Sequence, residues 1–70
     1  MSPLERFAAN MKELRAERGW SQEDLSRETG LHYTAISKME RRARAPSFPT
    51  VVTLAEAFKV PAGRLFDGIP

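Results

Sequence analysis

Apolar residues recur every three or four positions along most of this chain, which is the spacing of one helix face. Phe7, Met11 and Leu14 form the first such series. No stretch alternates between apolar and polar residues as a half-buried strand would, and there is no internal repeat. The pattern predicts an all-α fold of five helices in a single domain over residues 1–70. The expected helices cover about residues 3–18, 22–29, 33–41, 48–58 and 62–66.

The ends of these helices are marked by capping residues and by turn formers. Ser2 and Ser21 each stand three residues before an acidic side chain, which is the pattern of a capping box, and Ser47 can cap the fourth helix. Gly19 and Gly30 follow the first and second helices, where glycine adopts the left-handed conformation at little cost. The loops between the expected helices are therefore short.

Two short predicted helices meet at Gly30 with only a tight turn between them. Such a pair is either a helical hairpin or a helix-turn-helix. Ser26 is small enough to let two helices cross closely, and Ile36 is placed to fill the crossing from the second helix. Further core contacts are expected from Leu25, Leu31 and Met39. Taken together, these spacings favour the helix-turn-helix.

Basic side chains gather on and just after the third predicted helix. The 70-residue chain carries a formal charge of only +2, but residues 33–44 hold four basic side chains against the single acid Glu40. The four are Lys38, Arg41, Arg42 and Arg44. A basic cluster often marks only a solvated face, but this position also suits a partner that carries phosphates.

Composition argues against several other classes of protein. The chain has no cysteine, one histidine and no cluster of carboxylates on a single face, so we expect no enzyme activity, no metal site and no cofactor. It has no apolar run near the ~20 residues of a membrane span and no secretory signal, so we expect a cytoplasmic protein without a membrane segment. We also expect no attached ligand-binding domain and no small-molecule ligand.

Most of the chain resembles one known family. The resemblance lies in WSQEDLSRETGLHYTAISKMERR, followed by PSFPTVVTLAEAFKVPAGRLF. These segments are similar to the lambda-repressor-like DNA-binding domains of the xenobiotic-response-element (XRE) family, with its Ser-Gln start, turn glycine, Met-Glu pair and closing Leu-Phe. The similarity extends from about Phe7 to Phe66. Stand-alone members of the family include restriction-modification controller proteins, Cro-type phage repressors and some antitoxins.

The resemblance implies where the chain would contact double-stranded DNA. The residues expected to read base edges are Tyr33, Thr34, Ser37 and Lys38. Phosphate contacts are expected from Gln22, His32, Arg41, Arg42 and Arg44. The placement agrees with physical reasoning, because a recognition helix enters the major groove with its N-terminal residues nearest the bases. Arginines behind that helix supply affinity without sequence information.

Each of these residues also has a plainer interpretation. His32 can cap the helix instead of touching a phosphate, and Tyr33 can pack as half-buried surface. Gln22 is a common first-turn helix residue, and Lys38 can be simply solvated. Trp20 is interpreted as a core residue beneath the turn rather than as a platform for stacked bases.

The family likeness further implies an ion pair between Arg15 and Glu40, which would hold the recognition helix on the first helix. The chain departs from the family pattern after the third and fourth helices, where Arg42 and Lys59 replace glycine. Either these two residues adopt the left-handed conformation, at about 1–2 kcal/mol each, or the helices end differently. Pro61 replaces the usual capping serine, so the expected last helix lacks a side-chain cap.

These features lead to a hypothesis of a sequence-specific transcription regulator that binds double-stranded DNA as a homodimer on a palindromic operator. One short helix reads only a few base pairs, so a second copy would double the readout. The family places its dimer surface on the last helices, which makes Val60, Leu65, Phe66 and Ile69 the candidates. The alternative hypothesis is an antitoxin-like interaction module whose main partner is a toxin or another protein.

Overall fold

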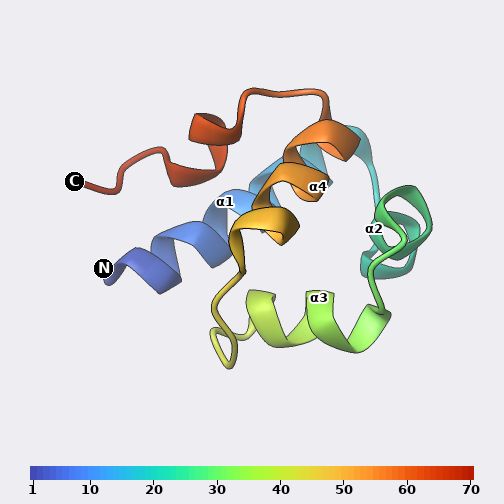
Figure 1. Cartoon of the computed structure of the whole chain (residues 1–70), viewed down its shortest axis with the longest axis horizontal. Helices are drawn as coiled ribbons and strands as arrows, with labels where there is room; N and C mark the ends of the chain where they lie inside the picture. The colour runs from blue at the N-terminus through green and yellow to red at the C-terminus, as the bar shows by residue number, and fades with distance from the viewer.

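Four α-helices and one closing turn of 3-10 helix make up the computed structural model, which describes residues 1–70. The elements are α1 (Pro3–Arg18), α2 (Gln22–Thr29), α3 (Tyr33–Glu40), α4 (Phe48–Phe58) and η1 (Ala62–Phe66). Figure 1 shows α3 along the lower edge, α2 at one end, and both chain termini at the opposite end. None of the helices is both long and apolar enough to span a membrane.

The prediction of an all-helical chain is confirmed, but the expected count of five α-helices is wrong. The last element is a five-residue 3-10 helix, and Pro61 at its start makes no side-chain capping bond. Because proline has no hydrogen-bonding side chain, the first N–H groups of this helix receive no side-chain capping bond. The third helix ends at Glu40, one residue earlier than expected. Arg42, two residues on, has a positive φ that no α-helix accepts.

Serine caps begin three of the four α-helices, as the sequence predicts. The Ser2 hydroxyl accepts from the Glu5 N–H over 3.1 Å, and the Ser21 hydroxyl accepts from the Asp24 N–H over 3.0 Å. In return each carboxylate accepts a hydrogen bond from the backbone N–H of its serine, which lowers the pKa of Glu5 and of Asp24. Ser47 caps α4 in the simpler one-way form.

The two residues that depart from the family pattern, Arg42 and Lys59, both adopt the left-handed backbone conformation. Arg42 has a φ of 64° and Lys59 a φ of 58°, so each takes the conformation that glycine favours. Lys59 closes α4 with its own N–H bonded to the carbonyl groups of Ala55 and Glu56. The hydrogen-bonding pattern of the helix ends is therefore kept without glycine, at a conformational cost of about 1–2 kcal/mol per residue.

A single hydrophobic core joins all five elements. Its eleven buried members are Phe7, Met11, Leu14, Leu25, Ile36, Met39, Val51, Leu54, Ala55, Phe58 and Leu65. Trp20 packs against this core and stacks on Phe58 at 5.8 Å between ring centroids. Trp20 thus lies beneath the chain turn, which agrees with its interpretation as a core residue. The core fixes the position of α3, because both Ile36 and Met39 are enclosed by it.

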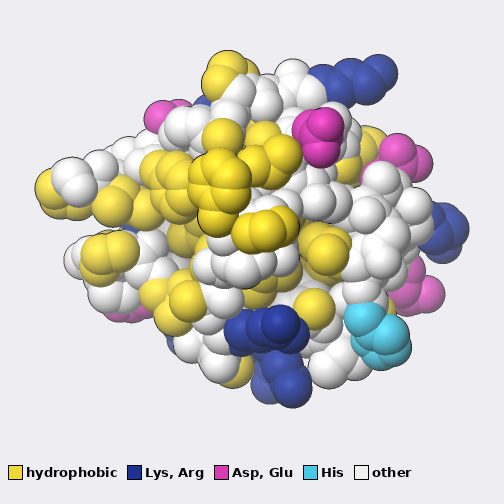
Figure 2. Space-filling model, viewed as in Figure 1, with side chains coloured by type: hydrophobic (Ala, Val, Ile, Leu, Met, Phe, Trp, Pro, Cys, Tyr) yellow, Lys and Arg dark blue, Asp and Glu magenta, His cyan; other side chains and the backbone are white.

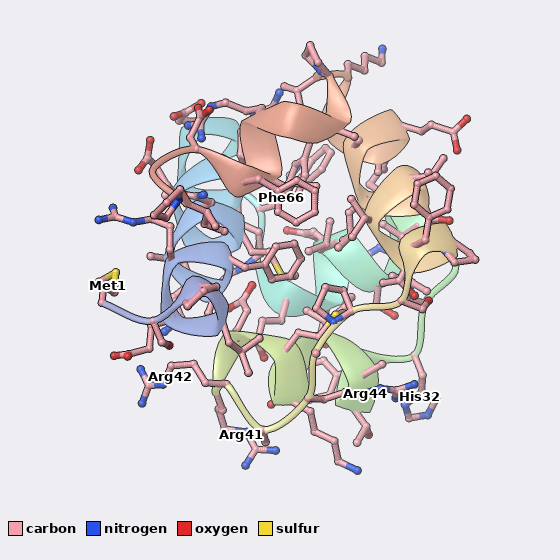
Figure 3. The ribbon with its side chains drawn as sticks, turned by 60° about the vertical axis from the view of Figure 1, so that its left-hand side comes forward. Met1, His32, Arg41, Arg42, Arg44 and Phe66 are labelled. Carbon is pink, nitrogen blue, oxygen red and sulfur yellow. The ribbon has the colours of Figure 1, made fainter.

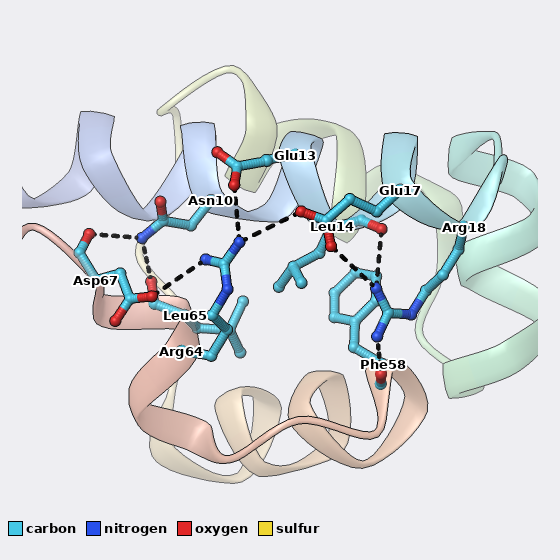
Figure 4. Close-up of polar contacts among 9 residues, drawn as sticks. All are labelled: Asn10, Glu13, Leu14, Glu17, Arg18, Phe58, Arg64, Leu65 and Asp67. Carbon is cyan, nitrogen blue, oxygen red and sulfur yellow. Dashed lines mark hydrogen bonds and ion pairs between the residues drawn. The ribbon is translucent and has the colours of Figure 1, made fainter.

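Polar contacts that no sequence spacing indicated fasten η1 to α1 (Figure 4). Asn10 is buried and donates both amide hydrogens, to the carbonyl oxygens of Leu65 and Asp67, over 2.9 Å each. Arg64 adds a surface ion pair to Glu13 at 2.8 Å. A buried amide with both donors satisfied holds a short, poorly capped 3-10 helix in one position.

Candidate nucleic-acid interface

The turn between α2 and α3 has the geometry of a helix-turn-helix. Gly30 ends α2 with a φ of 76°, a left-handed value, and α3 begins three residues later, at Tyr33. The Ser26 hydroxyl donates to the Leu31 carbonyl over 2.6 Å, and the Thr29 hydroxyl accepts from the Leu31 N–H over 3.1 Å. Ser26 therefore does more than leave room for the helices to cross, because its hydroxyl fixes the turn itself.

One face of α3 is buried and the other is open to solvent. Ile36, Met39 and Glu40 are enclosed, whereas the four residues expected to read bases lie on the outward face. These are Tyr33, Thr34, Ser37 and Lys38, of which Ser37 is half-buried and the other three are exposed. The structure thus gathers the expected readers on one accessible surface, where Thr34 and Ser37, Thr34 and Lys38, and Tyr33 and Ser37 stand three or four residues apart, as neighbours on a helix face do.

The N-terminal end of α3 is capped by its histidine. The His32 Nδ1 accepts a hydrogen bond from the Thr34 N–H over 3.0 Å, and the His32 side chain is exposed. The capping interpretation of His32 is confirmed, and the cap leaves Nε2 directed away from the helix end. Any phosphate contact of His32 would have to use that second nitrogen.

Three exposed arginines follow α3 and have no carboxylate partner. Arg41, Arg42 and Arg44 take part in none of the ion pairs, which hold four other arginines. Arg41 instead donates from Nε to the Ser37 hydroxyl over 3.3 Å. Figure 3 shows these arginines and His32 along the same lower edge of the molecule, beside α3. Arg41 and Arg44 therefore keep their full attraction for an anion such as phosphate. The pKa of Glu5 is lowered mainly by its hydrogen bonds with Ser2 and also by the charge of Arg42, so Arg42 has a carboxylate nearby that partly offsets its charge.

Behind the open face, one buried carboxylate joins three helices. Glu40 of α3 is 1% exposed, and both of its oxygens accept from the Arg15 guanidinium of α1 over 2.7 Å. Gln22 of α2 donates its amide to Oε1 of the same carboxylate over 3.0 Å. The hydrogen bonds from Arg15 to Glu40 raise the pKa of that guanidinium. The expected Arg15–Glu40 ion pair is present, in bidentate form.

The contact of Gln22 with Glu40 was missed by sequence reasoning, which assigned Gln22 only to a DNA phosphate. The amide nitrogen carries two hydrogens, so one remains free while the other is bound to Glu40. Gln22 is half-buried at the first position of α2. No sequence spacing links residues 22 and 40, and only the folded chain brings them together.

Among the four residues expected at a dimer surface, the prediction is wrong for Leu65. Leu65 is 0% exposed and belongs to the core, so it cannot contact a second copy. The apolar spacing that suggested an interface there instead serves to anchor η1. Phe66 is 41% exposed, and Val60 and Ile69 are half-buried against the core.

A surface feature with no counterpart in the sequence reasoning is an apolar groove of about 530 Å³. Its walls come from the start of α1, the loop before α4, the start of α4, η1 and the following tail, and no charged side chain lines it. Phe48, the first residue of α4, stands at this groove and is 80% exposed. Figure 2 shows hydrophobic side chains gathered across this face of the molecule, with basic side chains and the histidine below them. No group of three or more potential metal-ligating side chains lies together anywhere in the chain.

Comparison with known proteins supports the same family that the sequence resembles. The profile of the HTH_3 helix-turn-helix family matches residues 11–65. A hypothetical transcription factor of Neisseria meningitidis serogroup B is 38% identical over 59 residues, which cover 84% of this chain and 56% of that protein. The HTH-type transcriptional regulator SutR of Escherichia coli K12 is 34% identical over 62 residues, 87% of this chain and 35% of SutR. The chain thus spans about half or less of the length of these relatives.

Solved structures of similar fold include two kinds of protein. The Neisseria hypothetical transcription factor NHTF superposes with a TM-score of 0.89 at 34% identity, covering 93% of this chain and 75% of that one. The restriction-modification controller protein C.AhdI of Aeromonas hydrophila gives 0.86 at 33% identity, covering 90% of this chain and 96% of that one. The controller protein C.Esp1396I, solved as a tetramer in complex with its natural 35-base-pair operator, gives 0.84 at 27% identity over 96% of this chain and 88% of that one. With a turn glycine, an open α3 face and these matches in agreement, the chain belongs to the HTH_3, XRE-type family of helix-turn-helix domains.

Proposed function

We propose that the chain is a sequence-specific transcription regulator that binds double-stranded DNA as a homodimer on a palindromic operator. The observation that carries the proposal is the open face of α3, where four polar side chains project beside three arginines that have no carboxylate partner. Exposed side chains on such a face do not stabilise the fold by burial. It supplies the two kinds of contact that a duplex requires, to base edges and to phosphates.

Sequence would be read by the outward face of α3 in the major groove, with its N-terminal residues nearest the bases. Thr34 offers a hydroxyl for a base edge and a methyl group for the methyl of thymine. Lys38, one turn further along the same face, reaches guanine O6 and N7 or a phosphate. Tyr33 is 46% exposed, so its hydroxyl and ring edge are both available at the leading end of the helix. Ser37 lies between them, with its oxygen already bonded to Arg41.

Phosphate contacts would flank this face and carry no sequence information. Arg41, Arg42 and Arg44 lie past the end of α3, where the sugar-phosphate backbone passes a helix that is seated in the groove. His32 would contribute Nε2 at the other end of α3, and Gln22 its remaining amide hydrogen at the start of α2. Gln22 would then link a phosphate to the buried carboxylate that holds α3.

The proposal of a homodimer rests on the dimensions of the molecule. An eight-residue helix extends only about 12 Å, so one copy reaches few base pairs. The molecule measures 30 × 23 × 22 Å, so two copies side by side suit recognition helices that enter successive major-groove turns about 34 Å apart. The similar controller protein C.Esp1396I, which was solved on its operator as a tetramer, supports assembly of this kind on DNA.

Selection of binding sites from random duplexes, carried out at two salt concentrations, tests this function. We expect enriched sites with two-fold symmetry, and an affinity that falls steeply as salt is raised because counterions are released from the phosphates. Affinity that is the same for every sequence would contradict the proposal and leave only a general attraction for polyanions.

An interaction module of the antitoxin type is the second candidate function. The observation that favours it is the apolar groove with Phe48 at its edge, since large exposed apolar patches often mark protein partners. The same selection experiment discriminates between the two functions. A pure interaction module would enrich no sequence at all. A regulator would enrich specific sequences without any partner present.

A further inference from the structure

The first turn of α3 is held differently from the rest of that helix. The buried residues of α3 are Ile36, Met39 and Glu40, which all lie beyond its first turn. Tyr33 and Thr34, the two leading base readers, are exposed, so the core encloses neither side chain. The start of the helix, where the readers stand, is therefore fixed mainly by hydrogen bonds to its backbone.

His32 accepts all of these hydrogen bonds. Its carbonyl oxygen accepts from the N–H groups of Ala35 and Ile36 over 3.0 and 3.2 Å, and its ring Nδ1 accepts from the Thr34 N–H over 3.0 Å. As the second residue of α3, Thr34 has no carbonyl partner within the helix. The imidazole of His32 thus holds the backbone of Thr34 directly.

The residue before His32 gives this cap a fixed base. The Leu31 N–H donates to the Thr29 hydroxyl over 3.1 Å, and the Leu31 carbonyl accepts from the Ser26 hydroxyl over 2.6 Å. The side chain of Leu31 packs against the core. A continuous series of contacts therefore runs from α2 through Leu31 and the imidazole ring to Thr34.

The cap also determines which ring nitrogen carries a hydrogen. A neutral imidazole has one donor and one acceptor nitrogen, whereas an imidazolium has two donors and cannot accept. Because Nδ1 of His32 accepts from a backbone N–H, the capping ring is neutral and its hydrogen is on Nε2. None of the ion pairs in the molecule includes His32. The ring lies at the opposite end of α3 from Arg41 and Arg42, and it offers DNA a donor without a positive charge (Figure 3).

We propose that His32 is a specificity-determining residue that acts through Thr34, by capping the recognition helix with a neutral ring. The inference rests on the proposed function and deepens it, because it names the residue that positions a base reader. Loss of the cap would free the first turn of α3 and let the Thr34 side chain move relative to the bases. Discrimination between sequences would then fall, while the arginine contacts to phosphates would remain.

Two substitutions at this position separate the cap from the ring. His32→Ser keeps a capping oxygen of the kind that begins the other three α-helices, whereas His32→Ala has no capping atom. Each variant is measured on the selected operator and on operators with single base-pair changes. We expect His32→Ser to discriminate as the wild type does. His32→Ala should lose up to about tenfold in discrimination, only at the base pairs that Thr34 reads. Unchanged discrimination in His32→Ala, or an equal loss in His32→Ser, would overturn the proposal.

Ser47→Ala is the matched control for loss of a cap. Ser47 caps α4 through one hydrogen bond, to the Thr50 N–H, just as His32 caps α3. Removal of the Ser47 hydroxyl should lower the Tm and leave discrimination unchanged. The ratio of two affinities does not depend on the folded fraction, because both operators meet the same protein. A loss of discrimination in Ser47→Ala would mean that stability, not the position of Thr34, governs readout, and the proposal would fail.

A double variant tests whether His32 acts through Thr34. His32→Ala combined with Thr34→Ala should discriminate no worse than Thr34→Ala alone, since the reader that the cap positions is already absent. A further loss in the double variant would mean that His32 reads bases itself, which contradicts a positioning role.

The state of the ring can be observed directly, because His32 is the only histidine in the chain. In the ¹⁵N-labelled protein at pH 8 we expect a scalar coupling across the hydrogen bond between the Thr34 amide nitrogen and Nδ1, both free and on a duplex. His32→Ser should keep the wild-type slope of log affinity against log salt, since a neutral donor releases no counterion. A coupling that disappears on the duplex would mean that the cap breaks on binding. A slope reduced by about 1 per copy would mean that the ring binds as a cation. Either result would refute the proposal.

The outcomes separate this inference from the proposed function. A wild-type protein that enriches no sequence would overturn the function itself. A wild-type protein that selects operators, with relaxed readout in Thr34→Ala and full discrimination in His32→Ala, would keep the function and overturn the inference.

Discussion

Glu40 is the one acidic side chain that the fold encloses, and its hydrogen bonds decide where α3 sits. Its carboxylate receives three hydrogen bonds, two from Arg15 on α1 and one from Gln22 on α2. A buried charge is tolerated only when it is paired in this way. A single residue at the end of the recognition helix thereby ties that helix to both of its neighbours, which keeps the outward face in a fixed direction.

We predict that Glu40→Ala lowers the free energy of unfolding by about 3 kcal/mol, because it leaves the partly buried Arg15 without its partner. Arg42→Ala should change it by less than about 0.5 kcal/mol, since Arg42 is exposed, has no ion pair and keeps a β-carbon at the same left-handed position. Denaturant titration of both variants at one protein concentration measures the difference. Equal midpoints would contradict an architectural role for the pair.

Thr34 provides the corresponding prediction for readout. Thr34→Ala should lose about 1–3 kcal/mol of discrimination at one or two base pairs of each half-site, because a base-edge contact disappears while phosphate contacts remain. Binding to a set of operators with single base-pair changes measures this loss. Thr34→Ser keeps the hydroxyl without the methyl group, so it should lose preference only where thymine is contacted. A uniform loss across all operators would place Thr34 outside the reading surface.

At the scale of whole elements, backbone strain at the end of a helix is offset by the packing of the core beside it. α4 closes with Lys59 at a φ of 58°, although glycine adopts this conformation without strain. The neighbouring Phe58 is fully buried, so the packing of that ring holds the chain in place at the helix end. Arg18 adds to this fixation, with its guanidinium 5.3 Å from the centre of the Phe58 ring and a hydrogen bond to the Phe58 carbonyl.

Lys59→Gly should therefore raise the free energy of unfolding by roughly 0.5–1 kcal/mol. Removal of the β-carbon relieves about 1–2 kcal/mol of strain, and part of that gain is offset by the greater freedom of glycine in the unfolded chain. Thermal unfolding at fixed concentration should show a Tm a few degrees higher. Lys59→Ala removes the same charge but keeps the β-carbon, so it should leave the Tm unchanged. A similar rise in both variants would mean that charge, not backbone strain, limits stability here.

The sequence was sufficient to predict these elements because their boundaries are encoded locally. A capping serine lies within one turn of the N–H it satisfies, as with Ser2, Ser21 and Ser47, and a turn glycine acts at its own position. The division of α3 into buried and open faces follows from helical spacing in the same way. All four α-helices could therefore be placed to within about a residue.

Contacts between distant parts of the chain could not be predicted in this way. Nothing near Gln22 indicates a bond to Glu40, and nothing near Asn10 indicates its bonds to one carbonyl group in η1 and one just after it. Phe48 lies three residues before the buried Val51, a spacing that would suggest burial, yet it projects at the edge of the groove. Spacing along one helix tells which residues share a face, but the extent of the core that covers the face is set by the other helices.

For the molecule as a whole, the placement of charge matters more than its sum. The net charge of +2 is small, and four arginines are neutralised by nearby carboxylates on α1, α2, α3 and the tail. The arginines beside α3 form no ion pair, so positive charge gathers along this edge of the molecule. The field of that edge would steer a duplex toward α3 and would weaken as salt screens it.

Arg44→Ala tests this distribution of charge at the level of the complex. It should weaken binding to all operators by a similar factor, and it should reduce the slope of log affinity against log salt by about 1 per copy, or about 2 for a dimer. Lys59→Ala is the matched control, since it removes one exposed positive charge at the far end of α4 from the loop that carries Arg44. Its slope should equal that of the wild-type protein. If the two variants reduced the slope equally, DNA would be attracted by the overall charge of the molecule and not by the edge along α3.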